Sequence, residues 1–160
     1  MGILPELVGF CEGGVSLLLG TRDADNRPAC ARLVGAKVSP DRDRVTVLVP
    51  EGPGARVLAN LRDNGLAAVT FVRPLDARGM QVKGRCVAVR EATADERALA
   101  ERYLASLARS LFEVGMHQAL VVRLTIAPLA AIDVAVEEVF QQTPGPTAGT
   151  LLVRTEGGAP

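Results

Sequence analysis

The stretch ACARLVGAKV, residues 29–38, has the composition of a buried β-strand that is interrupted by two cations, Arg32 and Lys37. Its small and β-branched apolar residues favour an extended conformation with a buried face. Leu33 and Val34 are expected in the core, so Arg32 beside them is expected to be buried as well. A buried guanidinium needs a carboxylate or a bound anion to offset its desolvation, and its planar fork fits phosphate oxygens. The two cations therefore either extend to water or hold an anion.

The spacing of the two cations limits how they could act together. Lys37 lies five positions after Arg32, and an odd offset places two side chains on opposite faces of a regular strand. They can serve one ligand if the strand bulges or twists near Gly35, or if the ligand is long enough to meet the strand at two places.

The segments on either side of this stretch predict an antiparallel meander. Apolar strands are expected at VSLLLGT, residues 15–21, and at RVTVLVP, residues 44–50. The connections RDADNRP and SPDRD contain the Asp, Asn and Pro that are typical of turns, and they are too short for helical crossovers. A doubly wound parallel sheet is therefore the poorer alternative.

Further strands are expected after the meander, at residues 66–72, 80–91, 119–128 and 131–140. The second of these is long and carries Gly84 at its centre, where a strand usually bulges or meets another backbone. The last one alternates apolar and charged residues, which predicts one buried and one wet face.

Three helices are expected beside these strands. The first begins at Pro5, the second covers residues 55–64, and the third begins after Thr93, whose spacing from Glu96 is that of a capping box. Six or seven antiparallel strands with about three peripheral helices predict a mainly β, α+β fold. Its sheet should close fully or partly into a barrel, because closure removes exposed edges.

One domain, residues 1–143, is expected to hold this fold, followed by a Pro- and Gly-rich tail, residues 144–160, that is partly disordered.

The 18 basic and 18 acidic residues cancel, so no net charge favours nucleic acid binding. No apolar stretch approaches the roughly 20 residues that span a bilayer. Cys11, Cys30 and Cys86 are widely spaced and predict reduced core thiols. A soluble, cytoplasmic protein is expected.

The sequence lacks the residues that a hydrolytic site or a metal site would need. His117 is the only histidine, so no metal site is expected, and no serine has the strand-to-helix context of a nucleophile. An anion site has more support, because VPEGPGARVL places a Gly-rich loop and a helix N-terminus beside Arg56. Gln81 and Lys83 share one face of their strand and offer an amide and a cation. A plain turn and a solvent-facing stripe are the alternatives for these two features.

The order and spacing of these elements resemble the FMN-binding split-barrel superfamily, that of pyridoxamine 5'-phosphate oxidase and its relatives. The resemblance extends to about residue 150, from the N-terminal helix and the hairpin LLLGTRDADNRPACARLVGAKV through MQVKGRCVAV to the closing VFQQTPGPTAG. It implies a split β-barrel and a homodimer that binds FMN at the subunit interface. The vitamin oxidase itself is not implied, because the chain has no Trp and lacks the Arg-Leu-His-Asp-Arg pattern of the oxidase.

The resemblance also implies which residues contact the cofactor. The second strand of the family carries an Arg, two or three apolar residues and a Lys five positions after the Arg. Here these are Arg32, Leu33, Val34 and Lys37. The start of the helix after the third strand supplies a phosphate contact, here Arg56.

Other positions of the family pattern are matched in part. In place of the Ser and Lys that flank the helix Arg in the family, the chain has Ala55 and Val57. Gln81, with Lys83 on the same face, lies in the strand that supplies a flavin-contacting Gln. Val49 lies near a position that often carries a hydroxyl or an amide.

We therefore expect a flavin-binding oxidoreductase whose chemistry is that of FMN and whose substrate is unknown, with no residue assigned to catalysis. A deazaflavin coenzyme, which related barrels hold in a similar groove, is one alternative. The other is a barrel that is not an enzyme, and that binds haem or another ligand or has lost its cofactor. The missing Ser and Lys support this second alternative.

Overall fold

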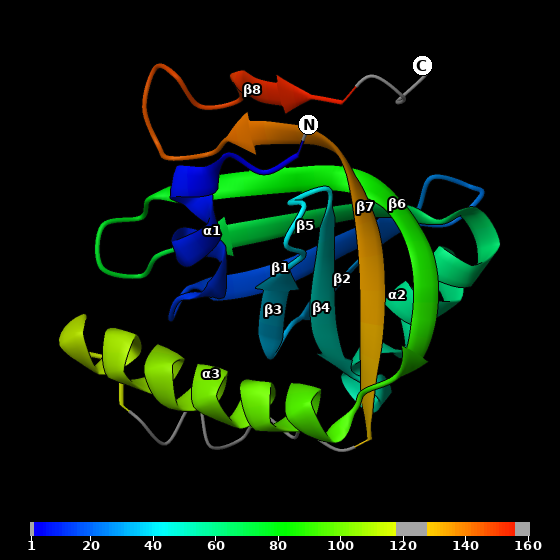
Figure 1. Cartoon of the computed structure of the whole chain (residues 1–160), viewed down its shortest axis with the longest axis horizontal. Helices are drawn as coiled ribbons and strands as arrows, with labels where there is room; N and C mark the ends of the chain where they lie inside the picture. The colour runs from blue at the N-terminus through cyan, green and yellow to red at the C-terminus, as the bar shows by residue number, and fades with distance from the viewer. Residues whose placement is uncertain (1, 118–127, 156–160) are drawn as a thin grey trace.

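The computed structural model describes residues 2–117 and 128–155 of the chain and shows a curled antiparallel sheet with helices at its margins (Figure 1). Within the described residues there are three helices, Pro5–Glu12 (α1), Glu51–Asn64 (α2) and Ala94–Glu113 (α3). The strands of the same residues are Ser16–Arg22 (β1), Pro28–Arg32 (β2), Gly35–Val38 (β3), Arg44–Pro50 (β4), Leu66–Val72 (β5), Gly79–Glu91 (β6), Leu129–Gln141 (β7) and Leu151–Arg154 (β8).

The strands form one sheet in the order β2-β1-β5-β6-β7-β4-β3, with β8 paired to β7. β2 and β3 lie at the two ends of this path, yet only Leu33 and Val34 separate them in the chain. The Leu33 N–H donates to the Leu17 carbonyl on β1 at 3.1 Å, and the Val34 N–H donates to the Leu48 carbonyl beside β3 on β4 at 2.8 Å. Residues 29–38 therefore pass from one end of the sheet to the other and curl it into a split barrel.

The predicted antiparallel meander is confirmed, with one change in its middle strand. β1 pairs with β2 and β3 pairs with β4, both antiparallel. The continuous strand expected over residues 29–38 is broken at Leu33 and Val34, because its two halves bond to opposite ends of the sheet. This break and the strand β8 give eight strands in the described residues, where six or seven were expected. The mainly β, α+β class is confirmed.

Gly84 lies at a bulge in β6, as its central position in the strand predicted. The register between β6 and β7 shifts between Lys83 and Gly84. A Cβ on Gly84 would lie 1.8 Å from the Ala135 carbonyl oxygen on β7, so only glycine lets the two backbones approach this closely. Figure 1 shows β6 and β7 curving together along one side of the barrel.

The third helix begins with the predicted capping box. The Glu96 N–H donates to Thr93 Oγ1 at 3.2 Å, and the Thr93 N–H donates to the Glu96 carboxylate at 2.8 Å. Arg90 on β6 donates to both oxygens of that carboxylate at 2.7 Å. The Arg90 guanidinium lowers the pKa of Glu96 to about 2, and the same contact ties the start of α3 to the sheet.

The second helix begins at Glu51, four residues before its predicted start. The segment EGPG, which was expected to be a loop, forms its first turn. Pro53 is accommodated there because the first N–H groups of a helix have no intrahelical acceptor. Gly65 ends the helix in the left-handed conformation, with φ at 72° and its N–H bonded to the Leu61 carbonyl.

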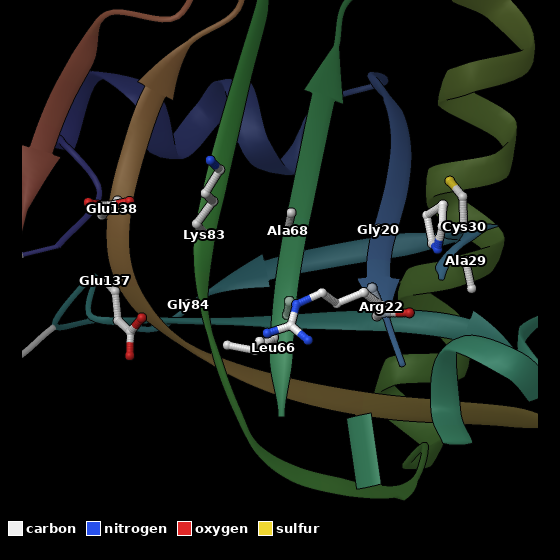
Figure 2. Close-up of a pocket in the computed structure, with 13 residues that line it drawn as sticks. Gly20, Arg22, Ala29, Cys30, Leu66, Ala68, Lys83, Gly84, Glu137 and Glu138 are labelled. Atoms are coloured by element: carbon white, nitrogen blue, oxygen red, sulfur yellow. The ribbon is translucent and has the colours of Figure 1, made fainter. Parts of the chain in front are cut away.

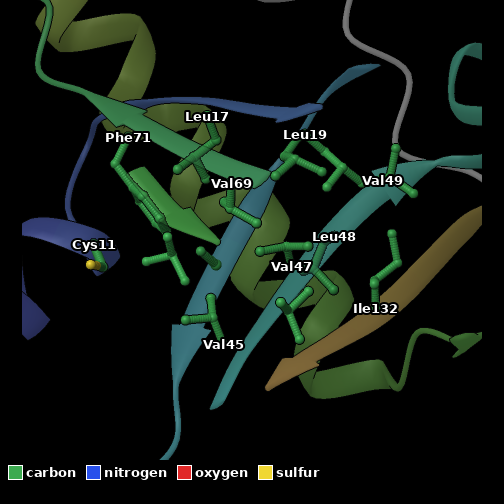
Figure 3. Close-up of a cluster of buried hydrophobic side chains, with 14 of the residues drawn as sticks. Cys11, Leu17, Leu19, Val45, Val47, Leu48, Val49, Val69, Phe71 and Ile132 are labelled. Atoms are coloured by element: carbon green, nitrogen blue, oxygen red, sulfur yellow. The ribbon is translucent and has the colours of Figure 1, made fainter. Parts of the chain in front are cut away.

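The core lies between the inward faces of the curled sheet, as Figure 3 shows. Leu17 and Leu19 on β1 and Val69 and Phe71 on β5 are fully buried. Because alternate residues of a strand point to opposite faces, the residues between these point away from the core. This alternation creates the outward face that the next subsection describes.

The C-terminal segment contains structure that the sequence did not indicate. Residues 151–154 form β8, in which the buried Val153 pairs with Val139 on β7, so this part of the Pro- and Gly-rich tail is ordered. The Pro and Gly residues before β8 build the connection from β7. The strand predicted at residues 119–128 lies outside the described residues, except for its last residue.

The three cysteines are free thiols in different environments. Cys11 is buried as predicted, and Cys86 is half-buried. Cys30 is exposed, which corrects the expectation of a core residue, because its side chain lies on the outward face of β2. Among the described residues, no helix is both long and apolar enough to cross a membrane.

Candidate functional site

Four residues form a row across the outward face of the sheet. The register pairs Arg32 on β2 with Leu18 on β1, Leu18 with Thr70 on β5, and Thr70 with Gln81 on β6. Gln81 Nε2 donates to Thr70 Oγ1 at 2.9 Å, which places these two side chains on one face. At roughly 4.8 Å per strand, the row spans about 14 Å from Arg32 to Gln81. Two of the predicted site residues therefore lie at the ends of one row.

Arg32 is exposed, and this corrects the expectation that its guanidinium is buried. It points outward at the end of β2, while Leu33 and Val34 both turn into the core. Arg32 Nη1 donates to Ser16 Oγ at 3.1 Å. None of the ion pairs among the described residues includes Arg32. Its charge is therefore available to an anion on the outward face.

Leu33, Val34 and Val49, which the resemblance placed at the cofactor, have fully buried side chains. The N–H groups of Leu33 and Val34 are used by the sheet at the crossing from β2 to β3. A ligand on the outward face does not reach these three side chains. In this structure they pack the core and hold the strand end that carries Arg32.

Lys37 is exposed but lies in a different row from Arg32. It pairs with Thr46 on β4, and Thr46 pairs with Asp133 on β7. Thr46 Oγ1 donates to Asp133 Oδ1 at 2.7 Å. Because β2 and β3 are separate strands, the odd spacing of Arg32 and Lys37 no longer dictates that they lie on opposite faces. The break nevertheless does not bring Lys37 into the row of Arg32 and Gln81.

Arg56 lies on the exposed side of α2, in its second turn. Because α2 begins at Glu51, the free N–H groups of its N-terminus belong to the turn before the one that carries Arg56. Ala55 is exposed, whereas Val57 is buried in the core. Arg56 is therefore a single surface cation on a helix that packs against β1 and β2.

A groove of about 770 Å³ lies beside the row, on the outward face (Figure 2). It contains a second row, formed by Cys30 on β2, Gly20 on β1, Ala68 on β5 and Lys83 on β6. Gly20 and Ala68 have little or no side chain, so the sheet is hollowed between the longer side chains. The volume is within the range of small-molecule sites. Lys83 is the predicted site residue that lines this groove.

Tyr103 on α3 completes the surroundings of Arg32, at the point where β2 leaves β1. Its buried hydroxyl donates to the Val15 carbonyl. Burial raises the pKa of Tyr103, and the positive charge of Arg32 and the Leu17 N–H act in the opposite direction. The helix thus holds the end of β1, where Ser16 accepts the hydrogen bond from Arg32.

Sequence reasoning missed several of these residues. Ser16, Thr70 and Tyr103 carry ordinary polar groups, and only the strand register and the packing of α3 reveal that they lie near the predicted cations. One signal was present in the sequence: Gly20 and Ala68 are small residues at outward positions of their strands, two residues from the larger Leu18 and Thr70. Small outward residues on neighbouring strands are what a hollow in a sheet surface requires.

The family profile described as pyridoxamine 5'-phosphate oxidase matches residues 3–143. The chain therefore belongs to the pyridoxamine 5'-phosphate oxidase family, which its sequence resemblance had indicated. A comparison with curated proteins gave no match.

Solved structures share the fold at low sequence identity. HupZ from Group A Streptococcus superposes with a TM-score of 0.56 at 17% identity, over 92% of this chain and 99% of its own. An F420 reductase superposes with a TM-score of 0.58 at 15% identity, over 86% of this chain and 98% of its own. An FMN-binding protein from Syntrophomonas wolfei subsp. wolfei superposes with a TM-score of 0.50 at 14% identity, over 84% of this chain and 85% of its own. At these identities the likeness shows the split-barrel fold alone.

Proposed function

We propose that the protein is a flavin-dependent oxidoreductase that binds FMN along the row from Arg32 to Gln81. The observation that carries the proposal is this row, with a cation at one end and an amide at the other, about 14 Å apart. FMN is an elongated molecule with a phosphate at one end and a ring with polar edges at the other. A guanidinium suits the phosphate, and an amide suits the donors and acceptors of the ring.

The chain has separate tasks in this proposal. Arg32 holds the phosphate from β2, and the family pattern, rather than a contact in the structure, adds Arg56 on α2 as a second cation for it. Gln81, oriented by its bond to Thr70, meets the ring. Bound FMN supplies the hydride or electron transfer, and the chain supplies position and charge.

The proposal includes a homodimer with FMN at the subunit interface. Its support is the row on the outward face of the sheet, where the apolar side chain of Leu18 on β1 is 36% exposed. Outward strand faces in water are normally polar, so this apolar surface favours a partner that covers it.

The three free thiols fit a reducing compartment, and we place the protein in the cytoplasm.

Titration of the purified chain with FMN and with riboflavin tests the proposal. Riboflavin has the same ring and lacks the phosphate. Arg32→Gln is expected to weaken FMN binding by about 1.5–3 kcal/mol, the range for a hydrogen bond to a charged group, and to leave riboflavin binding unchanged. Arg62→Gln, on the exposed face of α2, is the matched control. No FMN binding at about 100 μM would reject the proposal.

A deazaflavin coenzyme is the second candidate, and the surroundings of Arg56 favour it. The phosphate of FMN is a monoester, whereas that of a deazaflavin coenzyme is a diester with less negative charge. Arg56 has exposed Ala55 on one side and buried Val57 on the other, which offers fewer donors than a dianion prefers. Parallel titrations of the two coenzymes decide between them. If neither binds, the remaining alternative is a barrel without a flavin coenzyme.

A further inference from the structure

The groove beside the row is not occupied by the flavin contacts proposed above. It lies two residues along each strand from that row, which is about 7 Å. Its floor is apolar, since Gly20, Ala67, Ala68 and Leu66 all line it. A flat apolar molecule could lie on this floor, next to whatever occupies the row of Arg32.

The groove also has room that a side chain could fill. A Cβ on Gly20 would meet only the Ala68 carbonyl oxygen, at 3.7 Å, which is ordinary van der Waals contact. A larger residue at this position therefore occupies the groove without straining the backbone. The hollow is thus a feature of side-chain size, and it can be removed without changing the fold.

Both carboxylates at the groove have arginine partners. Arg85 Nε lies 3.5 Å from Glu137 Oε1, and Arg154 Nη2 lies 2.7 Å from Glu138 Oε1. These two charges on the wall formed by β7 are therefore largely compensated.

Two cations line the groove, Arg22 and Lys83. Arg22 Nη1 donates to the Asp23 carbonyl at 3.2 Å, and Lys83 Nζ lies 4.5 Å from the centre of the Phe140 ring. Neither takes part in an ion pair among the described residues. Figure 2 shows the Arg22 guanidinium over Leu66 on β5, and Lys83 apart from it on the next strand, β6. The groove therefore has two cations without an ion-pair partner in the described part of the chain and two carboxylates paired with arginines, above an apolar floor.

We propose that this groove is the substrate half of the site and that its substrate is a flat organic anion, such as an aromatic or conjugated carboxylate. The apolar floor takes the body of the molecule, and Arg22 and Lys83 attract its anionic group. The assignment as substrate rests on the proposed function, because it places the flavin in the adjacent row.

The test uses 2-naphthoate as the probe and neutral 2-naphthalenemethanol as its matched partner, each titrated by calorimetry into the full chain with and without FMN. Wild type is expected to bind 2-naphthoate about tenfold more tightly than the alcohol, and Arg22→Gln to remove most of this difference. Gly20→Val is expected to abolish binding of both probes and to keep the FMN affinity of the wild type. Gly9→Val, on the exposed face of α1 with nothing near its Cβ, is the control.

Cys30 provides a second readout, because its thiol lines the same groove. Saturating 2-naphthoate is expected to slow its alkylation by iodoacetamide, measured by mass spectrometry, in wild type and in Gly9→Val.

Three results would overturn the inference: equal affinity for acid and alcohol, unchanged 2-naphthoate binding in Gly20→Val, or conversion of a dimer to a monomer by Gly20→Val. The last result would assign the groove to the interface between two copies. The flavin proposal fails separately. If wild type binds 2-naphthoate in the groove and no flavin, the anion site stands and the flavin assignment is rejected.

Discussion

The Tyr103 hydroxyl on α3 donates a hydrogen bond to the Val15 carbonyl, at the place where β2 turns away from β1. The β1–β2 ladder runs from Leu18 to Arg22 on β1, so Val15 lies beyond its end. A helix side chain thus takes the place of a strand at the split of the barrel. It does so next to Ser16, the partner of Arg32.

Loss of this hydroxyl should destabilise the fold. Tyr103→Phe keeps the ring and leaves the Val15 carbonyl without this donor, which is expected to lower the free energy of unfolding by about 1–3 kcal/mol. Urea denaturation followed by circular dichroism measures the change. Glu101→Gln, exposed on the same helix, should stay within about 0.5 kcal/mol of wild type. Equal stability of Tyr103→Phe and wild type would show that the bond contributes nothing.

A side chain at position 84 should disrupt the barrel. In Gly84→Ala the new Cβ meets the Ala135 carbonyl oxygen of the neighbouring backbone, which cannot move aside as a flexible side chain would. The expected loss is about 3 kcal/mol or more, measured by thermal and urea unfolding. Gly9→Ala is the control, because its Cβ enters open space in a helix and should stabilise the chain by about 0.5–1 kcal/mol. Similar stability of the two variants would contradict the close approach at Gly84.

The contact between Arg90 and Glu96 should make stability depend on pH in the acid range. The pKa of Glu96 falls from an ordinary value near 4.5 to about 2 in the folded chain. Its contribution is therefore fully present above pH 4.5 and is lost as the pH falls toward 2. At this partly exposed site the contribution should be about 1 kcal/mol. The stability difference between wild type and Glu96→Gln, measured from pH 7 to pH 2, should shrink over that window, and a constant difference would contradict the assignment.

The three thiols should react at different rates with iodoacetamide. Cys30 is exposed and should be alkylated first. Burial raises the pKa of Cys86, and it raises the pKa of Cys11 to about 12, so Cys11 should react last. Mass spectrometry of quenched samples gives the order, and unfolding in urea should make all three equally reactive. Reaction of Cys11 as fast as Cys30 in the native chain would contradict its burial.

Much of the fold could be predicted from the chain because its signals are local. The alternation of apolar residues located β1, β4 and β5 to within a residue. The spacing of Thr93 and Glu96 located the start of α3, and the central glycine of β6 predicted a bulge. The predicted elements agreed less well with the structure where local sequence signals were ambiguous. EGPG has the composition of a loop and forms a helical turn, and β8 lies within a segment rich in Pro and Gly.

The sequence by itself determined where most of the strands lie and that Arg32 and Lys37 interrupt an apolar stretch, because side-chain periodicity and turn chemistry act over a few residues. It also placed Arg32 and Gln81 among the candidates through their resemblance to a family. Only the tertiary structure decided that these two share one row and that Lys37 does not. That outcome depends on which strands become neighbours when the sheet closes. Closure is decided by hydrogen bonds between segments far apart in the chain, such as those of Leu33 and Val34 to opposite ends of the sheet.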